Sequence, residues 1–157
     1  KKKKKQPASD AQAEAKKLAE AGDLDAALGK LDKAIKIEPD EAAFYALRGQ
    51  ILKEQKKDAA AQKDFDKAVS LYPEMFSYRL HRGLGYLDEN KLDQAKEDLL
   101  AANQTVPTSI AFLRLGDIAV KQNNRDEAIK YYQVAAQASG DIAAEAQQKL
   151  AALTQQQ

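Results

Sequence analysis

The sequence predicts an all-α fold, a right-handed α–α superhelix of four helical hairpins that ends in a C-terminal capping helix. Three observations support this prediction. Prolines recur every 34 residues, at Pro39, Pro73 and Pro107. Small side chains recur at fixed offsets from those prolines. The composition favours helices, with only seven Gly and no Trp in 157 residues. A period of about 20–50 residues indicates supersecondary units stacked one upon the next.

Two alanines and a bulky residue precede each of these prolines at constant distances. In chain order they are Ala27, Leu31 and Ala34, then Ala61, Phe65 and Ala68, then Ala95, Leu99 and Ala102. Gly49 and Gly83 lie ten residues after the first two prolines. Small side chains let two antiparallel helices approach closely. The bulky residue fills the space toward the next hairpin, and proline ends the second helix of each unit.

A fourth unit follows with one residue deleted. Gly116 lies nine residues after Pro107, and Ala128, Tyr132 and Ala135 then fall at the expected offsets from that glycine. This period of 34 residues, with its small, bulky and proline positions, resembles the tetratricopeptide repeat. The resemblance implies that the leading helix of each hairpin lines a concave groove, where an extended protein ligand is expected to bind.

The repeats are expected at about 8–41, 42–75, 76–108 and 109–140, followed by a capping helix over 141–154. Asp141 is the expected N-cap of that last helix. Residues 1–7 are expected to form a basic, disordered linker. The first repeat is degenerate, because Ala15 replaces the glycine and the leading helix over 11–21 has few large apolar residues. We therefore expect that helix to be the least stable part of the array.

Composition excludes several classes of function. Lys1–Lys5 carry five positive charges against a whole-chain net charge of +1, so the remainder of the chain carries −4. An acidic body argues against nucleic-acid binding, which requires a basic face. The chain has no Cys, so it has neither disulfides nor thiolate metal sites, which fits the cytosol and the periplasm equally well. No segment has the apolar length of a membrane span.

No pattern of residues indicates catalysis, a metal or a cofactor. His81 is the single histidine, and neither HExxH nor HxxxH occurs. The sequence also lacks a nucleophile elbow, a P-loop and a dinucleotide-binding glycine motif. We therefore expect this segment not to be an enzyme and to hold no cofactor. His81 is expected to be an ordinary polar residue of the groove or surface.

Counting from the glycine position, the groove should be lined by the residues two and three before it and one and four after it. The predicted partner-binding residues at these positions are Leu47, Gln50, Lys53, Leu80, His81, Leu84, Leu87, Arg114 and Asp117, and Arg48 and Tyr78 are predicted in addition to the count. The same count adds Ala46, Leu113 and Val120. Arg48 and Arg82 stand where these repeats normally carry leucine. Each is expected either to pair with a carboxylate or to reach the groove.

One binding mode of this family holds a C-terminal carboxylate with lysines and asparagines at fixed groove positions. Those positions carry Lys16, Ala13, Leu47, Gln50, Ser77 and His81 in this chain. Only Lys16 has the matching residue type, so binding of chaperone tails in that mode is not expected.

Several strings resemble a narrower family. They are Phe44-Tyr45-Ala46-Leu47-Arg48-Gly49, Tyr78-Arg79-Leu80-His81-Arg82-Gly83-Leu84, Val106-Pro107-Thr108-Ser109 and Ala135-Ala136-Gln137-Ala138-Ser139-Gly140, with the Lys-Lys-Lys-Gln-Pro lead-in. Together they are similar to the C-terminal tetratricopeptide-repeat domain of bacterial periplasmic zinc metallopeptidases of the Ste24-like class. In that family a separate N-terminal domain with HExxH performs proteolysis, and the repeat domain is thought to engage substrates or outer-membrane assembly components.

This resemblance implies a periplasmic location and a chain that is part of a longer protein, with Lys1–Lys5 in the linker. The partners it implies are protein or peptide segments, or the peptidase domain of the same chain. The alternative is a free-standing or otherwise fused scaffold in envelope assembly or secretion, and a cytoplasmic location stays open. A third hypothesis is a surface that binds anionic membranes through Lys1–Lys5.

Overall fold

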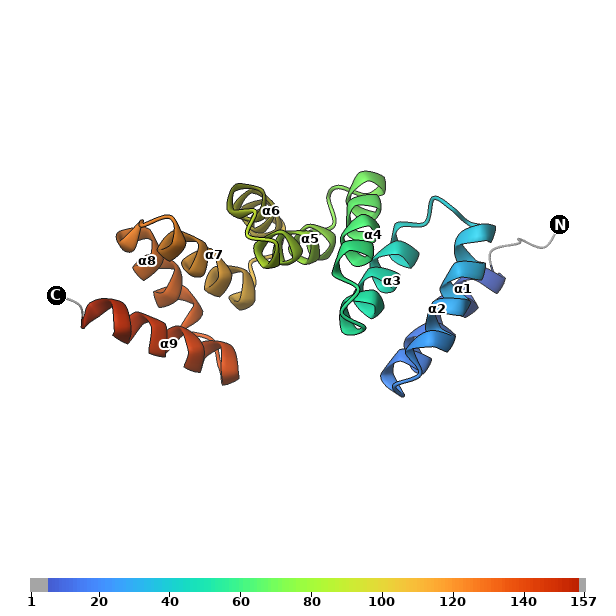
Figure 1. Ribbon diagram of the computed structural model, residues 1–157, viewed down its shortest axis with the longest axis horizontal. Coiled ribbons are helices and arrows are strands. Elements are labelled where there is room, and N and C mark those ends of the chain that lie inside the picture. Colours follow the sequence, from blue (N-terminus) through green and yellow to red (C-terminus); the bar gives the residue numbers. More distant parts are fainter. Residues whose placement is uncertain (1–5, 156–157) are drawn as a thin grey trace. The chain divides into compact units, whose positions relative to one another are not determined.

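The computed structural model describes the backbone of residues 6–155 and the side chains of residues 10–155. This described part contains nine helices and no strand (Figure 1). The helices are α1 (Gln6–Glu20), α2 (Leu24–Ile37), α3 (Ala42–Glu54), α4 (Asp58–Leu71), α5 (Phe76–Asp88), α6 (Leu92–Thr105), α7 (Ser109–Lys121), α8 (Arg125–Ala135) and α9 (Gly140–Thr154). The predicted all-α repeat fold is confirmed. Lys1–Lys5 lie outside the described residues, and α1 begins within the stretch expected to be linker.

The chain forms two compact units, residues 1–81 and residues 82–157. The first contains α1 to α4 and the beginning of α5. The second contains the end of α5 and α6 to α9. In the first unit α1 packs on α2 and α3 on α4, and in the second α7 packs on α8 and α8 on α9. The pairs α1–α2, α3–α4 and α7–α8 are the antiparallel hairpins that the sequence period predicts, whereas α9 packs on α8 from outside the repeat period.

The turn inside each hairpin is set by one residue with left-handed backbone. Gly22, Lys56, Asn90 and Asn123 have φ values of 89°, 60°, 59° and 59°. Their spacing follows the repeat, including the one-residue deletion. At the first turn the Gly22 amide donates to the Ala19 carbonyl at 3.0 Å, and other last-turn carbonyls are bonded in the same way. The prolines lie two residues beyond the ends of α2, α4 and α6, as expected from their inability to continue a helix.

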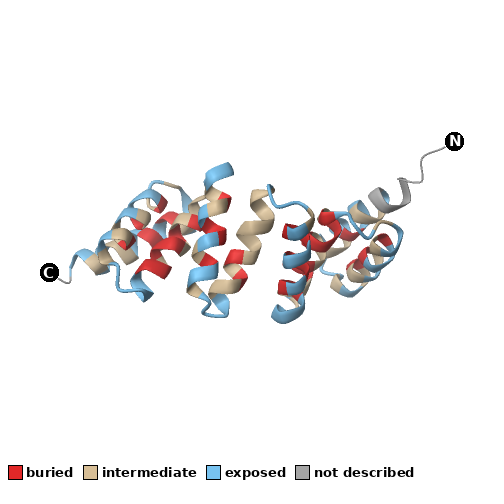
Figure 2. Cartoon of the chain, turned by 90° about the horizontal axis from the view of Figure 1, so that it is seen from above, coloured by how far each residue is buried: buried red, intermediate tan, exposed pale blue. Residues whose placement is uncertain are grey.

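The core of each unit lies between paired helices, where the small-residue positions meet the bulky ones. The buried residues, coloured in Figure 2, fall on both helices of the hairpins. A Cβ added to Gly49 would lie 2.7 Å from Cε1 of Phe65. The equivalent atom on Gly83 would lie 3.0 Å from Cβ of Asp98, and on Gly116 it would overlap the ring of Tyr132. The recurring glycine is therefore required by close packing against the following helix.

An ion pair joins the two helices of the hairpin in three of the four repeats. Lys30 pairs with Glu14 at 3.1 Å, Arg48 with Asp64 at 2.8 Å and Arg82 with Asp98 at 2.7 Å. These pairs occupy the same two repeat positions, with the charges reversed in the first repeat. The equivalent residues of the fourth repeat are Leu115 and Tyr131. The expectation that Arg48 and Arg82 pair with carboxylates is confirmed.

A polar contact also ties each of two leading helices to the proline turn before it. The Tyr45 hydroxyl donates to the Pro39 carbonyl at 2.6 Å, and Nε of Arg79 donates to the Pro73 carbonyl at 3.0 Å. Tyr45 and Arg79 are one repeat apart, as are the two prolines. The contact is therefore part of the repeat geometry, although a different side chain makes it each time.

The last helix differs from the expectation at its start. Helix α9 begins at Gly140 with Ser139 at the N-cap, so Asp141 lies in the first turn instead of capping it. A carboxylate in the first turn still interacts favourably with the helix dipole. Ile142, Leu150 and Leu153 pack on the core of the second unit, which makes α9 a capping helix. None of the described helices has the length and apolarity that crossing a bilayer requires.

Candidate partner-binding groove

A groove of about 740 Å³ lies in the second unit, among the C-terminal end of α5, helix α7 and helix α9, with one residue from α8. It is lined by Leu87, Asp88, Arg114, Asp117, Val120, Lys121, Tyr132, Lys149, Ala152 and Leu153. Its lining combines aliphatic side chains from three helices with charged groups of both signs.

Three of the predicted partner-binding residues meet in this groove. Leu87 comes from α5, and Arg114 and Asp117 come from successive turns of α7. Val120, one turn further on, also lines the groove and is 41% exposed. The positions two before and one and four after the glycine therefore converge on one surface in the fourth repeat. Leu84 is partly buried and does not line the groove.

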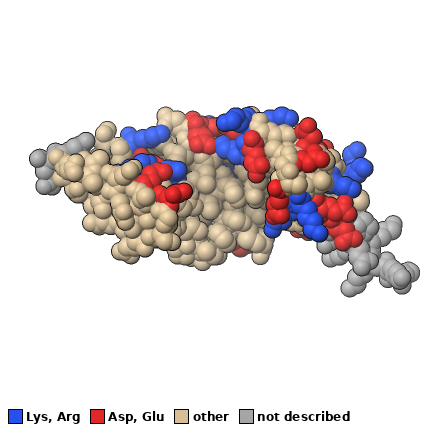
Figure 3. Space-filling model, turned by 90° about the horizontal axis from the view of Figure 1, so that it is seen from below, with Lys and Arg blue, Asp and Glu red and all other residues tan. Residues whose placement is uncertain are grey.

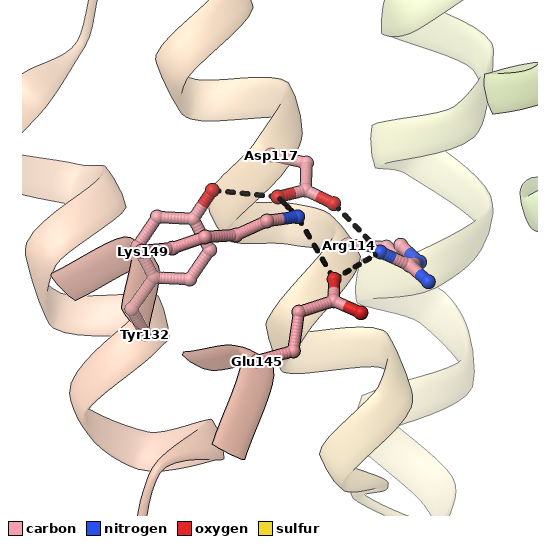
Figure 4. A network of polar contacts seen from close by, with 5 residues as sticks. All are labelled: Arg114, Asp117, Tyr132, Glu145 and Lys149. Carbon is pink, nitrogen blue, oxygen red and sulfur yellow. Dashed lines mark hydrogen bonds and ion pairs between the residues drawn. The ribbon is translucent and has the colours of Figure 1, made fainter. Parts of the chain in front are cut away.

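Five side chains form a polar network, shown in Figure 4, and four of them, all but Glu145, line the groove. Nη1 of Arg114 donates to Oδ2 of Asp117 at 2.9 Å and to Oε2 of Glu145 at 2.8 Å. Nζ of Lys149 donates to Oδ1 of Asp117 at 2.7 Å and to Oε2 of Glu145 at 2.8 Å. The Tyr132 hydroxyl donates to Oδ1 of Asp117 at 2.6 Å. The network thus joins α9 to α7 and α8.

The network shifts the ionisation of its members. Burial opposes the charge on Asp117, but hydrogen bonds from Lys149, Tyr132 and Arg114 outweigh burial and hold the pKa of its carboxyl below the usual value. Burial and the hydrogen bond to Asp117 raise the pKa of Tyr132. Burial opposes the charge on Lys149 too, but its bonds to Asp117 and Glu145 prevail and raise its pKa. The charged forms of Asp117 and Lys149 and the neutral form of Tyr132 are therefore favoured by the contacts that hold α9 against α7 and α8.

The position three residues before the glycine does not face a groove in two of the repeats. Ala46 is 3% exposed and packs with Tyr45 and Ala68, and Leu113 is 1% exposed within the core of the second unit. The expectation that these two residues line the groove is wrong. Both side chains instead fill the apolar core against the second helix of their hairpin, where their removal from water is favourable.

The other predicted residues of the second repeat lie in the first unit. Leu47 packs on the core between α1, α2 and α3. Gln50 is exposed, and Lys53 lies 3.4 Å from Asp58 in an ion pair. Nε and Nη2 of Arg48 donate to the two oxygens of Asp64 at 2.9 Å and 2.8 Å, a bidentate pair. Arg48, which was predicted to line the groove, is therefore held by the Asp64 carboxylate of α4.

Tyr78, Leu80 and His81 are all partly buried. Tyr78 meets Tyr72 edge to face with ring centroids 6.5 Å apart, and burial raises the pKa of its hydroxyl. His81 stacks on Phe65 at 5.3 Å, and burial lowers the pKa of its imidazole. Phe65 is one of the bulky repeat residues, so the stacking ties His81 to the hairpin core.

Sequence reasoning missed the contributions of α8 and α9. Tyr132 is the only member of its bulky repeat position with a hydroxyl, which distinguishes it from Leu31, Phe65 and Leu99. Glu145 and Lys149 are the only charged residues of α9 after Asp141, and they lie four apart on one face. These two features are signals that point to a polar contact of the capping helix.

Charges of both signs intermingle on the face of the molecule drawn in Figure 3, beside broad uncharged areas. Among the described residues, no cluster of three or more histidines and carboxylates could hold a metal ion.

Comparison with known proteins agrees with this architecture. The sequence profile of the tetratricopeptide repeat matches residues 13–76 and 80–143. The mouse and human proteins named DnaJ homolog subfamily C member 3 are each 32% identical over 93 residues, which is 59% of this chain. The chain spans 18% of the length of those relatives.

Solved structures show the same fold at low identity. A structure described as a functional characterisation of pilF from Pseudomonas aeruginosa matches with a TM-score of 0.82 and 18% identity, over 96% of this chain and 69% of that one. A MamA double mutant matches with a TM-score of 0.76 and 20% identity, over 83% and 74% of the two chains.

The first tetratricopeptide-repeat domain of Spaghetti (RPAP3), solved with an HSP90 peptide, matches with a TM-score of 0.71 and 24% identity. That match covers 75% of this chain and 97% of the other. The repeat is a protein-interaction fold without catalytic groups of its own. This chain belongs to the tetratricopeptide-repeat family.

Proposed function

We propose that this chain is a docking module that binds a segment of a partner protein in the groove among α5, α7 and α9. The observation that carries the proposal is the groove itself, about 740 Å³ and lined by Leu87, Val120 and Leu153 beside a fixed polar wall. Protein pockets that hold ligands measure about 300–1,000 Å³ and combine apolar surface with a few placed polar groups.

The polar wall favours binding because it is already ordered. Each charged member of the network is held by at least two contacts of 2.7–2.9 Å. A side chain that is fixed before binding loses little conformational entropy when the partner arrives. Val120 is a large apolar residue that stays 41% exposed, and covering it would contribute favourably to association.

A fold neighbour solved with an HSP90 peptide supports a peptide segment as the type of ligand. The similarity to that neighbour concerns the fold alone. At the groove positions where this family holds a terminal carboxylate with lysines and asparagines, only Lys16 of this chain has the matching residue type. We therefore propose a different set of contacts for this groove.

For the biological setting, we propose the substrate- or partner-docking domain of a periplasmic metallopeptidase in envelope protein quality control or outer-membrane assembly. The supporting observation is the set of strings around Gly49, Gly83, Pro107 and Gly140 that resembles that family. The alternative is a free-standing or otherwise fused scaffold in envelope assembly or secretion. A signal peptide and an HExxH motif in the gene upstream of Lys1 would favour the first setting, and a gene without them would remove it.

Binding at the groove can be tested by filling it. Ala152 lines the groove and is exposed, so Ala152→Phe should occupy the space without disturbing the core. Ala144→Phe is the matched control, because Ala144 is exposed on the same helix but does not line the groove. Twelve-residue peptides selected from a random display library on the full chain would serve as probes, with affinity measured by fluorescence anisotropy.

We expect Ala152→Phe to weaken peptide binding about tenfold or more, with an unchanged melting curve. Ala144→Phe should bind like the parent chain. Equal affinity of both variants, or failure of the library to yield any peptide that binds, would refute docking at this groove.

A further inference from the structure

The groove of the second unit has an unequal supply of hydrogen-bond donors and acceptors. Asp117 lines it, but both of its oxygens are already used. Oδ1 accepts from Tyr132 and Lys149, and Oδ2 accepts from Arg114. Asp88, the other carboxylate in the lining, also has an interaction within the chain. The acidic groups of the groove are therefore engaged before a ligand arrives.

The cationic groups of the groove carry N–H donors that make no hydrogen bond within the described part of the chain. A guanidinium carries five N–H donors, and Arg114 uses only Nη1, so Nη2 and Nε have no partner among the described residues. An ammonium carries three donors, and Lys149 uses two of them. Lys121 makes no hydrogen bond or ion pair with the described part of the chain and is exposed at the groove.

Apolar lining lies on all three helices around these cations. Leu87 comes from α5, Val120 from α7, and Ala152 and Leu153 from α9. A ligand that met only the cations would leave this apolar surface exposed to water. A purely aliphatic ligand would instead cover Lys121 and the spare donors of Arg114 without pairing them, which costs free energy.

We infer that the groove recognises an internal segment of a partner protein in which an acidic side chain is flanked by aliphatic residues. The carboxylate receives the spare donors of Arg114 and Lys149 and the charge of Lys121. The flanking aliphatic side chains cover Leu87, Val120 and Leu153. An internal carboxylate fits better than a terminal one, because apolar lining residues come from α5 and α9 as well as from α7, the helix that carries Arg114 and Lys121. This inference rests on the proposed docking function and defines its ligand.

The test uses the same display library on the full chain, followed by affinity measurements on the recovered peptides. Peptides should be enriched in Asp or Glu next to Leu, Ile or Val. Lys121→Glu should weaken their binding roughly fivefold or more, because it replaces an attraction with a repulsion. Lys130→Glu is the matched control, since Lys130 is exposed on α8 outside the groove and the change of net charge is identical.

Two peptide variants and a salt titration locate the recognised group. Replacing the internal Asp or Glu by Asn or Gln should abolish most of the difference between Lys121→Glu and the parent chain. Amidation of the peptide C-terminus should leave affinity unchanged, whereas a loss on amidation would overturn the internal carboxylate. Added NaCl should weaken the acidic peptide more than its amide variant.

The outcomes also separate this inference from the proposed function. Recovered peptides that bind, lose affinity with Ala152→Phe and yet show no acidic enrichment would overturn the inference and leave docking intact. Equal affinities of Lys121→Glu and Lys130→Glu for an acidic peptide would do the same. Peptides whose binding is insensitive to Ala152→Phe would overturn both.

Discussion

The close approach of Gly116 to Tyr132 allows a sharp test of the packing. A Cβ at position 116 would overlap the Tyr132 ring, which is 2% exposed and anchored by its hydroxyl at 2.6 Å from Asp117. Forcing extra volume into a packed site costs about 1–3 kcal/mol. The higher helix propensity of Ala returns about 1 kcal/mol. Gly116→Ala should therefore destabilise by up to about 2 kcal/mol, and more if the hydroxyl contact breaks.

Two further substitutions test whether the ring of Tyr132 is the reason for glycine at position 116. Gly29 lies inside α2 with nothing within 4 Å of an added Cβ, so Gly29→Ala should stabilise by about 0.5–1 kcal/mol. The first repeat carries Ala15 and Leu31 at the positions of Gly116 and Tyr132, and both are fully buried. Leucine at position 132 should consequently accommodate alanine at position 116.

Urea unfolding followed by circular dichroism would measure all four members of the cycle. In the Tyr132→Leu background, Gly116→Ala should be neutral or stabilising, which gives a coupling of about 1–3 kcal/mol between the two sites. An equal cost of Gly116→Ala in both backgrounds would show that the ring of Tyr132 is not the reason for the glycine. If Gly29→Ala destabilised the chain, the stabilisation expected from the higher helix propensity of alanine would be wrong.

Three further predictions concern other features of the fold. Lys56 is held at φ 60°, so Lys56→Gly should stabilise by about 0.5–1 kcal/mol by relieving left-handed strain, and an unchanged or lower urea midpoint would contradict this. Asp98 is 2% exposed, so Asp98→Ala should cost about 2–4 kcal/mol by leaving Arg82 without this carboxylate. The double substitution of Arg82→Leu and Asp98→Tyr copies Leu115 and Tyr131 of the fourth repeat. It should lower the free energy of unfolding by less than Asp98→Ala does in the same urea assay. Because the folded pKa of Asp117 is depressed, its contribution is present above the unfolded value of about 3.9 and is lost as pH falls through the folded value. Asp117→Asn should flatten this acid-side decline of the urea midpoint, and a parallel decline in both proteins would argue against it.

The stability of the first repeat stays a prediction. Helix α1 has Ala15 at the glycine position and few large apolar side chains. Amide hydrogens before residue 22 should therefore exchange faster than those of residues 76–105. Hydrogen exchange of the full chain would decide it, with equal protection as the contrary result.

Much of the fold was predictable because the same packing recurs in each repeat and requires the same type of residue at the same position. The glycine opposite Phe65 or Tyr132, and the proline two residues beyond a helix, each have one local cause that is visible in the spacing. At the left-handed turns, Gly22, Asn90 and Asn123 are residue types that tolerate this backbone, whereas Lys56 is a type that disfavours it.

The candidate groove was less predictable because it depends on contacts between repeats and the capping helix. The period identified Leu87, Arg114 and Asp117 as facing one side. It could not show that Lys149 and Glu145 of α9 reach Arg114 and Asp117, since α9 lies outside the repeat pattern. It also misplaced Leu113, because a core residue and a groove residue of the same helix can differ in direction by less than the roughly 100° that separates consecutive residues.

The groove of the second unit is proposed as the docking surface of this chain. Amide chemical-shift mapping of the isotope-labelled full chain, titrated with a selected acidic peptide, tests it most directly. We expect the largest shifts at the end of α5, along Arg114 to Lys121 and in α9 from Glu145 to Leu153. Shifts confined to α2, α4 and α6, with those groove residues unmoved, would contradict it.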